Sequence, residues 1–314
     1  RGGEGRRGRG IGGDSVSVTR SAPAKLNLRL RVLGREESGY HAVETLMLRL
    51  ALADRITVEP GPPGIRLVVS GSDALPEGPE NLCWRAADLV HRELDVAPAV
   101  VIRLEKRIPV AAGLGGGSMD AAAVLAALVE LLDRDPGTES LTRVAGRLGS
   151  DVPFGLCPGG MALGWERGRR LMPLPSPPAR PVLIAQPPFG IHAAEAYGWL
   201  AHDRERPAAE SGSTAAENGA ALFPRPDELT DWDVLERLAV NDLQEAVFHR
   251  HPELGVIRDA LSEAGAGISM LCGSGACVAG IFEEENVLDR AARDLQPKLG
   301  IPLIRTVTLG PHAG

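Results

Sequence analysis

A glycine-rich stretch, PVAAGLGGGSMDAAAV at residues 109–124, carries the clearest chemical pattern in the chain. Its three consecutive glycines, residues 115–117, come just before an Ala/Leu-rich run that predicts a helix over residues 121–132. Glycines there cost backbone entropy, so they need a compensating purpose. Free N–H groups and the positive end of a helix dipole form a good anion site. The stretch therefore predicts a phosphate-binding loop, with a turn capped by Ser118 and Asp120 as the alternative.

The loop matches neither of two common phosphate-binding sequences. No Gly-Lys-Ser/Thr follows it, so it is not a Walker A loop, and Ser118 occupies the place of the last glycine in G-x-G-x-x-G. Its position between an expected strand, residues 99–105, and an expected helix still favours phosphate binding.

Lys25 and Asn27 flank the start of a second informative stretch, LNLRLRVL at residues 26–33. Its strict alternation predicts a strand, in which the leucines share one face and Lys25, Asn27 and Arg29 share the other. A lysine beside an amide can hold a hydroxyl or a phosphate. Taken alone, an ordinary solvated strand face is the more common explanation.

An aromatic ring and an imidazole are adjacent in SGYH, residues 38–41. Tyr40 and His41 together can stack on and hydrogen-bond to a planar base. A partly packed tyrosine and a surface histidine explain the pair equally well.

Two further motifs each allow two interpretations. Asp151 in LGSDVPF is a turn or N-cap residue, or a general base if an acceptor hydroxyl lies within reach. The glycine-rich LCGSGACV, residues 271–278, predicts either a close approach of two backbones or a bulge.

The elements that must position these residues follow an α+β order, without regular βαβ alternation. Strands are expected at residues 15–19, 26–33, 46–52, 55–59, 65–70, 99–105, 159–165, 182–186, 275–282 and 304–309. Helices are expected at residues 81–94, 121–132, 139–148, 235–250, 254–264 and 287–295.

A proline-rich stretch, LPSPPARP at residues 174–181, predicts the boundary between two lobes. The N-terminal lobe is expected at residues 15–173 and the C-terminal lobe at residues 181–311. A Gly/Arg-rich tail, residues 1–14, is expected to be disordered, and an insertion at about residues 202–232 is expected to be flexible.

Composition excludes several classes of protein. A chain of 314 residues with 44% hydrophobic content can bury a large core, and a net charge of −7 argues against nucleic acid as the main partner. The four cysteines have neither zinc nor disulfide spacing, so we expect reduced thiols in the cytoplasm. The longest apolar run, residues 121–132, is too short to span a membrane, and RGGEGRRGRG at residues 1–10 lacks the apolar segment expected of a secretory signal.

Taken together and in this order, PAKLNL, GYH, PVAAGLGGGSMDAA, LGSDVPF and CGSGACV resemble the GHMP kinase superfamily. The resemblance covers roughly residues 21–309, interrupted at residues 202–232. It implies a ribosomal-S5-like N-terminal lobe and a ferredoxin-like C-terminal lobe, with ligands in the cleft between them. The triple glycine combined with GYH further implies ATP-dependent phosphorylation, with Mg²⁺, of the 2-hydroxyl of a CDP-linked methylerythritol in the non-mevalonate isoprenoid pathway.

The resemblance also implies residue roles. Asp151 would be the general base, Lys25 would stabilise charge beside it, and Asn27 would help position the acceptor hydroxyl. The residues expected to recognise cytosine are Tyr40, His41 and Tyr197. The residues expected to bind ATP are Asn81, Lys106, Pro109, Gly113, Leu114, Gly115, Gly116, Gly117 and Ser118.

Several positions depart from the family pattern. Met119 stands where a second serine is usual, which leaves the metal contacts open. His192 and Ala193 stand where Ser and Thr are expected, and Cys272 replaces a hydroxyl residue. The central residues are intact, so activity is expected. The alternatives are a GHMP kinase for a smaller alcohol, such as mevalonate, homoserine or a sugar, and a non-catalytic nucleotide-binding protein.

Overall fold

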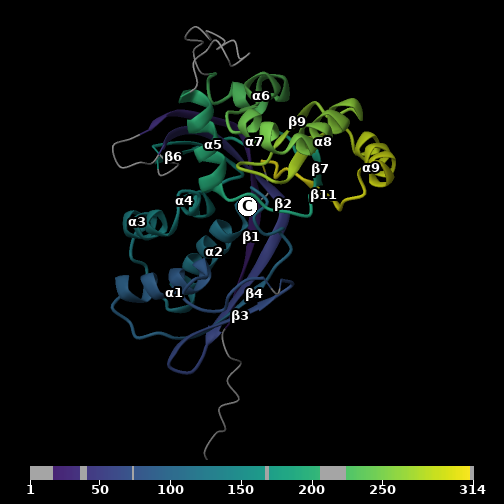
Figure 1. Ribbon diagram of the computed structural model, residues 1–314. Coiled ribbons are helices and arrows are strands. Elements are labelled where there is room, and N and C mark those ends of the chain that lie inside the picture. Colours follow the sequence, from purple (N-terminus) through teal and green to yellow (C-terminus); the bar gives the residue numbers. More distant parts are fainter. Residues whose placement is uncertain (1–16, 36–40, 73, 167–169, 206–223, 312–314) are drawn as a thin grey trace, which may run out of the picture.

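Two β-sheets, one of seven strands and one of four, organise the chain in the computed structural model (Figure 1). The structure describes residues 17–35, 41–72, 74–166, 170–205 and 224–311. Among these residues, no helix is long and apolar enough to cross a bilayer. The α+β class expected from the sequence is confirmed.

The larger sheet is built on two long antiparallel strands, β1 (Val18–Arg35) and β2 (His41–Pro60). The shorter strands expected at residues 26–33, 46–52 and 55–59 are parts of these two. Three register shifts interrupt their pairing, between Pro23 and Lys25, Asn27 and Arg29, and Val32 and Gly34. Such shifts bend a long strand and redirect its side chains.

Five further strands complete this sheet. They are β3 (Gly64–Ser70), β4 (Ala99–Glu105), β5 (Met161–Trp165), β6 (Arg170–Leu174) and β8 (Val240–Asn241). The main path runs β3-β4-β2-β1-β8, while β5 pairs with β2 and β6. Because β8 comes from the second half of the chain and pairs in parallel with β1, it joins the two halves.

Four helices accompany the larger sheet. They are α1 (Leu82–Glu93), α2 (Gly116–Leu131), α3 (Thr138–Leu148) and α4 (Val152–Leu156). Helix α2 begins at Gly116, five residues before the expected start, so two of the three glycines belong to its first turn. The alanines of α2 are nearly all buried in the core of this half, because their small side chains let neighbouring elements approach closely.

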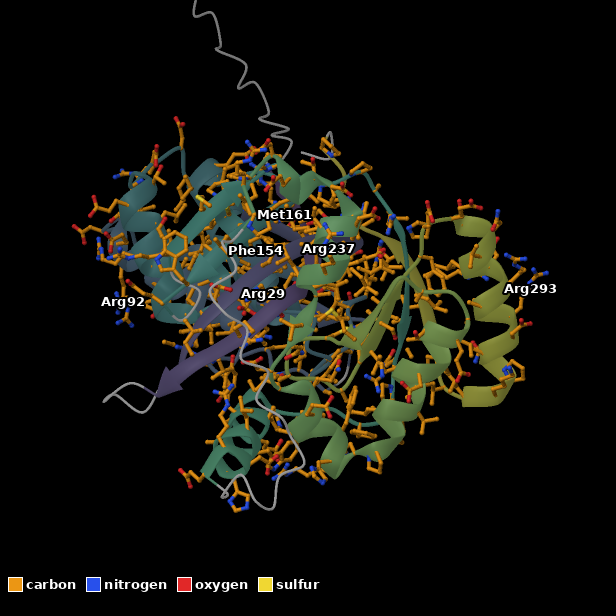
Figure 2. The ribbon with its side chains drawn as sticks, turned by 90° about the horizontal axis from the view of Figure 1, so that it is seen from above. Arg29, Arg92, Phe154, Met161, Arg237 and Arg293 are labelled. Atoms are coloured by element: carbon orange, nitrogen blue, oxygen red, sulfur yellow. The ribbon has the colours of Figure 1, made fainter. Side chains whose placement is uncertain are left out.

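The smaller sheet has the order β11-β7-β10-β9, and all of its pairs are antiparallel. Its strands are β7 (Pro181–Ala185), β9 (Ile268–Leu271), β10 (Val278–Ile281) and β11 (Leu303–Val307). Its main helices are α5 (Ala193–Glu205), α7 (Gln244–Arg250), α8 (Pro252–Glu263) and α9 (Glu285–Leu299). The succession strand, helix, two strands, helix, strand is ferredoxin-like, as expected. Arg92 of α1 and Arg293 of α9 mark opposite ends of the molecule in Figure 2.

One expectation in the second half was wrong, and the bounds of another were too wide. The helix expected at residues 235–250 is divided into α6 (Trp232–Leu238), β8 and α7, because Val240 and Asn241 pair with β1. The insertion expected at residues 202–232 is ordered at both ends, where α5 continues to Glu205 and a 3-10 helix, η1 (Glu228–Thr230), precedes α6. Apolar packing explains the second end, because Leu229 and Trp232 are buried. Residues 206–223 and the tail, residues 1–14, lie outside the described residues.

Candidate active site

Lys25 lies at the centre of the candidate site, and its side chain is only 5% exposed. Its Nζ donates to Asn27 Oδ1 at 2.5 Å and lies 3.2 Å from Asp151 Oδ2. Asn27 Nδ2 in turn donates to Thr45 Oγ1 at 2.8 Å, which fixes the amide so that its oxygen faces the lysine. The alternative of a solvated strand face is therefore wrong, since Lys25 and Asn27 are both buried.

Asp151 precedes α4, but its side chain does not cap that helix. Its carboxylate is 32% exposed and faces Lys25. Arg49 holds the other end of α4 by donating to the carbonyl oxygens of Phe154 and Cys157, both at 2.7 Å. Asp151 is therefore a turn residue at the N-cap position, as one interpretation of the sequence had it, but its side chain does not cap α4 and its carboxylate remains open to a ligand beside Lys25.

The glycine loop passes directly over the stem of Lys25. Gly115 adopts a φ of +71° at the N-cap of α2, and a Cβ there would lie 2.8 Å from both Cγ and Cε of Lys25. No side chain caps α2, so the alternative of a Ser118 or Asp120 cap is wrong. The first helical bonds are donated by the N–H groups of Ser118 and Met119 to the oxygen of Gly115, which places the N–H groups of the preceding glycines at the anion-attracting end of the helix.

The second glycine-rich turn packs against the first loop, backbone to backbone. Gly113 has a φ of +77°, and a Cβ there would lie 1.7 Å from the carbonyl oxygen of Cys272. A Cβ on Gly273 would lie 2.7 Å from Gly113 O and 3.2 Å from Asn27 Oδ1. Of the two interpretations of residues 271–278, the close approach of two backbones is therefore the correct one.

Asn241, which the sequence did not single out, holds this second turn. Its Nδ2 donates to the carbonyl oxygens of Leu271 at 3.0 Å and Gly273 at 2.7 Å. Its Oδ1 accepts the N–H of Leu243. A polar residue in an apolar stretch was the available signal, but residues 235–250 were expected to form one helix.

Lys106 forms a buried cluster with Asp54 and Asp120 beneath the glycine loop. Its Nζ pairs with Asp54 and lies 2.8 Å from Asp120 Oδ2. The same Nζ is 3.2 Å from where a Cβ on Gly116 would be. Burial opposes the charge of Lys106, but the two ion pairs outweigh it and raise its pKa.

The two carboxylates of this cluster are not equivalent. Asp54 Oδ1 accepts the N–H groups of Arg107 at 2.5 Å and Ile108 at 2.9 Å. Asp120 Oδ1 is buried with no hydrogen-bond partner among the described residues. Burial, with the nearby charge of Asp54, raises the pKa of Asp120 to about 7, although Lys106 opposes the shift.

The other residues expected to bind ATP lie in the loop itself, apart from Asn81 at the start of α1. Asn81 caps α1, with Oδ1 accepting the N–H of Cys83 and Nδ2 donating to Pro76 O, each at 2.9 Å. Pro109 is half-buried at the start of the loop. Leu114 is buried, and its carbonyl oxygen accepts the N–H of Lys25 at 2.9 Å. Gly117 is exposed and Ser118 is half-buried.

The residues expected to recognise cytosine are described only in part. Tyr40 lies outside the described residues, and only the backbone of His41, the first residue of β2, is described. Tyr197 lies on α5, half-buried. Burial raises the pKa of its hydroxyl, and the negative charge of Asp151 adds to the shift, so the hydroxyl lies within electrostatic reach of Asp151.

The positions that depart from the family pattern fall into two groups. Met119 and Cys272 are buried in the core. Met119 packs beside Gly155 of α4, where a Cβ on the glycine would lie 3.5 Å from its Sδ. His192 and Ala193 are exposed at the start of α5. In the described part of the chain, no three His, Cys, Asp or Glu side chains gather into a group that could hold a metal ion.

Comparisons with known proteins bear on the family and the fold of the chain. Residues 81–159 match the GHMP kinases N terminal domain, and residues 221–301 match the GHMP kinases C terminal domain. A 4-diphosphocytidyl-2-C-methyl-D-erythritol kinase of Pelotomaculum thermopropionicum is 42% identical over 88% of this chain and 93% of its own length. The kinase of that name from Anaeromyxobacter sp. is 43% identical over 93% of this chain and 91% of its own.

Solved structures give the same result for the fold. A crystal structure of a 4-(cytidine 5'-diphospho)-2C-methyl-D-erythritol kinase superposes with a TM-score of 0.73 at 33% identity, covering 93% of this chain and all of the other. A homoserine kinase from Cytophaga hutchinsonii superposes with a TM-score of 0.71 at 16% identity, covering 98% of this chain and 99% of that one, which supports the fold alone.

Proposed function

The chain belongs to the GHMP kinases, and from this we propose that it transfers the γ-phosphate of ATP to the 2-hydroxyl of 4-diphosphocytidyl-2-C-methyl-D-erythritol, a step of the non-mevalonate isoprenoid pathway. The observation that carries the proposal is the pair formed by Lys25 and Asp151, 3.2 Å apart, beside a glycine loop at the start of α2. A carboxylate, a lysine and a phosphate loop are what phosphoryl transfer to an alcohol requires.

Asp151 acts as the general base in this proposal. Its partly exposed carboxylate accepts the proton of the acceptor hydroxyl as the hydroxyl oxygen bonds to the γ-phosphorus. The bond from that phosphorus to the bridging oxygen breaks, and ADP leaves. Lys25 opposes the negative charge that gathers on the transferred phosphoryl group. Asn27, fixed by Thr45, holds Lys25 in place and lies beside the acceptor hydroxyl.

The glycine loop positions the phosphates of ATP. The glycines of residues 113–117 supply backbone N–H donors without Cβ atoms that would keep a phosphate at a distance. Lys106 places a positive charge below the loop, held by its two carboxylates. Asn81 and Pro109 lie at the nucleotide side, where Asn81 also fixes the start of α1.

Mg²⁺ accompanies ATP in this proposal. Magnesium in nucleotide sites is held mainly by phosphate oxygens, water and one or two protein oxygens. The donor set fits this mode, since the Ser118 hydroxyl and the Asp151 carboxylate are both accessible while Met119 offers no oxygen. When bound, the ion would neutralise phosphate charge and orient the transferred group.

The cytidyl group of the acceptor is the basis of specificity in this proposal. Tyr197, whose hydroxyl lies within electrostatic reach of Asp151, recognises the base together with Tyr40 and His41. The small-molecule substrates and the acidic charge suit an enzyme without a nucleic-acid partner. The four free thiols suit the reducing cytoplasm.

The substitution Asp151→Asn tests the proposal. We expect kcat to fall by about 10²–10⁴-fold, because a positioned proton acceptor contributes that much, while KM for ATP changes little. Asp133→Asn is the matched control, since it removes one carboxylate at an exposed position beyond the other end of α2. ADP release is measured with the CDP-linked alcohol, mevalonate and homoserine as acceptors. Turnover at the normal rate in the Asp151 variant, or with mevalonate or homoserine only, would contradict the proposal.

A further inference from the structure

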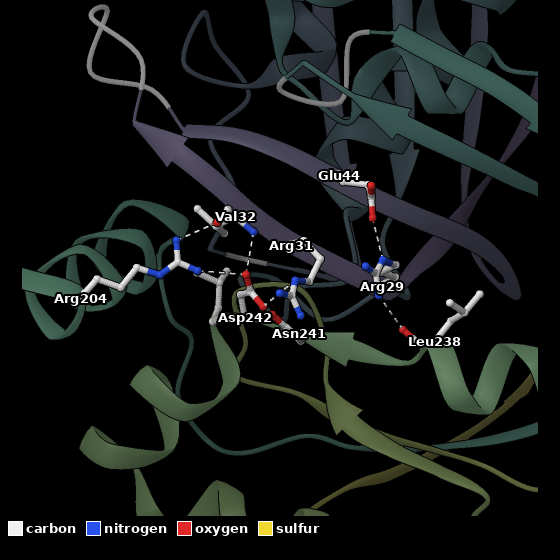
Figure 3. A network of polar contacts seen from close by, with 9 residues as sticks. Arg29, Arg31, Val32, Glu44, Arg204, Leu238, Asn241 and Asp242 are labelled. Atoms are coloured by element: carbon white, nitrogen blue, oxygen red, sulfur yellow. Dashed lines mark hydrogen bonds and ion pairs between the residues drawn. The ribbon is translucent and has the colours of Figure 1, made fainter. Parts of the chain in front are cut away.

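The carboxylate of Asp242 joins two elements that flank the site (Figure 3). Its Oδ2 accepts the N–H of Val32 on β1 at 2.9 Å and Nη2 of Arg204 on α5 at 3.0 Å. Its Oδ1 lies 3.3 Å from Nε of Arg31. The Asp242 side chain is only 12% exposed, so its contacts with these three donors are partly shielded from water. We call Asp242, Arg204, Arg31 and Val32 the Asp242 clamp.

The clamp extends the hydrogen bonding between β8 and β1 beyond the point where their backbone pairing ends. Strand β8 ends at Asn241, and the N–H of Asp242 still donates to Leu30 O at 2.9 Å. Two residues further along β1, the Asp242 side chain accepts the N–H of Val32, and Arg204 Nη1 donates to Val32 O at 2.7 Å. Both backbone groups of Val32 are therefore satisfied by side chains, which ties α5 to the edge of β1.

Arg204 shares a helix face with Tyr197. The two residues lie seven positions apart on α5, which is two helical turns, so their side chains project from nearly the same side. Fixing Arg204 against β1 and Asp242 therefore sets the rotation of α5 about its axis. On another part of the helix, Asp203 forms a two-pronged pair with Arg250 of α7, with both distances 2.7 Å.

The clamp connects to the rest of the site through Asn241 and β1. Asn241, which precedes Asp242, holds the turn at Gly273 that covers Lys25 and Asn27. Arg29, two residues before Arg31 on β1, pairs with Glu44 at 2.7 Å and so fixes the same strand from its other side (Figure 3). The orientation of α5 is thus set relative to the strand that carries Lys25.

We propose that Asp242 and Arg204 are positioning residues that hold Tyr197 at the correct distance from Lys25 and Asp151, and so determine the affinity for the pyrimidine nucleoside part of the acceptor. The inference rests on the proposed function, because it concerns the acceptor side of that reaction. The clamp touches neither substrate, and it acts through the placement of Tyr197 alone.

The test compares KM for the two substrates. In Arg204→Met and in Asp242→Asn, we expect KM for the CDP-linked alcohol to rise about tenfold, equivalent to about 1.4 kcal/mol, with kcat and KM for ATP changed less than about twofold. Arg204→Lys keeps the charge and should restore part of the affinity. The matched control is Arg305→Met, which removes an arginine of similar exposure from its pair with Asp289 between β11 and α9 and should leave both KM values unchanged.

A second measurement separates positioning from general destabilisation. In a Tyr197→Ala background, Arg204→Met should raise KM for the acceptor by less than about twofold, because the residue through which the clamp acts is already gone. A full tenfold rise in that background would overturn the proposal. Equal rises in both KM values, or no rise in either, would overturn it as well.

The same assays distinguish the two levels of inference. If the wild-type chain does not phosphorylate the CDP-linked alcohol, the proposed function fails, and the clamp inference fails with it. If the wild type is active on that substrate and Arg204→Met leaves its KM unchanged, only the clamp inference fails.

Discussion

Gly115→Ala tests whether the glycine loop fixes the position of the Lys25 side chain. A side chain at a φ of +71° costs roughly 1–2 kcal/mol of stability. The new Cβ would also lie 2.8 Å from Cγ and Cε of Lys25, whereas carbon atoms in contact prefer about 3.5–4.0 Å. The stem of Lys25 must therefore move by about 1 Å, and its Nζ must leave the positions 2.5 Å from Asn27 Oδ1 and 3.2 Å from Asp151 Oδ2. A displacement of about 1 Å in a catalytic group can lower the rate by about 10²-fold.

Gly300→Ala is the matched control for this substitution. Gly300 has a φ of +62° and, like Gly115, a left-handed backbone, but a Cβ there meets nothing within 4 Å. Urea unfolding should show a loss of about 1–2 kcal/mol in Gly300→Ala and at least as much in Gly115→Ala, because both backbones are left-handed and only Gly115 adds the contact with Lys25. Only Gly115→Ala should lose kcat, by about 10²-fold. If the two variants kept equal kcat values, the inference that the loop fixes Lys25 would be refuted.

Two further predictions concern buried groups. Asp120→Asn removes a carboxylate whose pKa is raised from 3.8 to about 7, so the folded wild type holds the proton over a pH range in which the unfolded chain has lost it. The free energy of unfolding of the wild type should therefore fall relative to that of the variant as pH rises from about 4 to about 7. Urea unfolding measures both free energies across that range, and an equal pH dependence in the two proteins would contradict the shifted pKa. Asn241→Ala leaves the carbonyl oxygens of Leu271 and Gly273 without their donor, so the free energy of unfolding in urea should fall by about 1–3 kcal/mol. A fall below about 0.5 kcal/mol would show that the turn does not depend on Asn241.

Local sequence patterns predicted those parts of the fold that depend on local periodicity. The strand β4 and the helix α3 lie where alternation and helical spacing placed them, within one residue. The start of α2 was placed five residues late, because glycine was taken as a helix breaker. In the structure Gly116 and Gly117 are helical, since the cost of their backbone entropy is offset by the packing of the buried face of α2.

The residues missed in the site are those whose partners lie far away in the sequence. Lys106 was expected near the nucleotide, but nothing local indicated that Asp54, 52 positions earlier, would pair with it. Asn241 was hidden because Leu235 to Arg250 has apolar spacing suited to one helix, while the pairing of β8 with β1 depends on a strand more than 200 residues away. Such contacts are decided by tertiary packing, which local propensity does not contain.

The placement of Lys25 shows why the two halves of the chain must assemble for the site to exist. Its stem is covered by Gly115 from the first half, and its Nζ lies 3.4 Å from where a Cβ on Gly273, from the second half, would be. The backbones at Gly113 and Cys272 meet so closely that neither turn can shift without the other. A buried lysine is costly unless its charge is paired and hydrogen-bonded, and here Asp151 supplies the opposite charge and Asn27 a hydrogen-bond acceptor. The glycines therefore matter for Lys25 as much as for the proposed phosphate binding. They let two backbones pack over the lysine, whose charge must stay beside the carboxylate of Asp151.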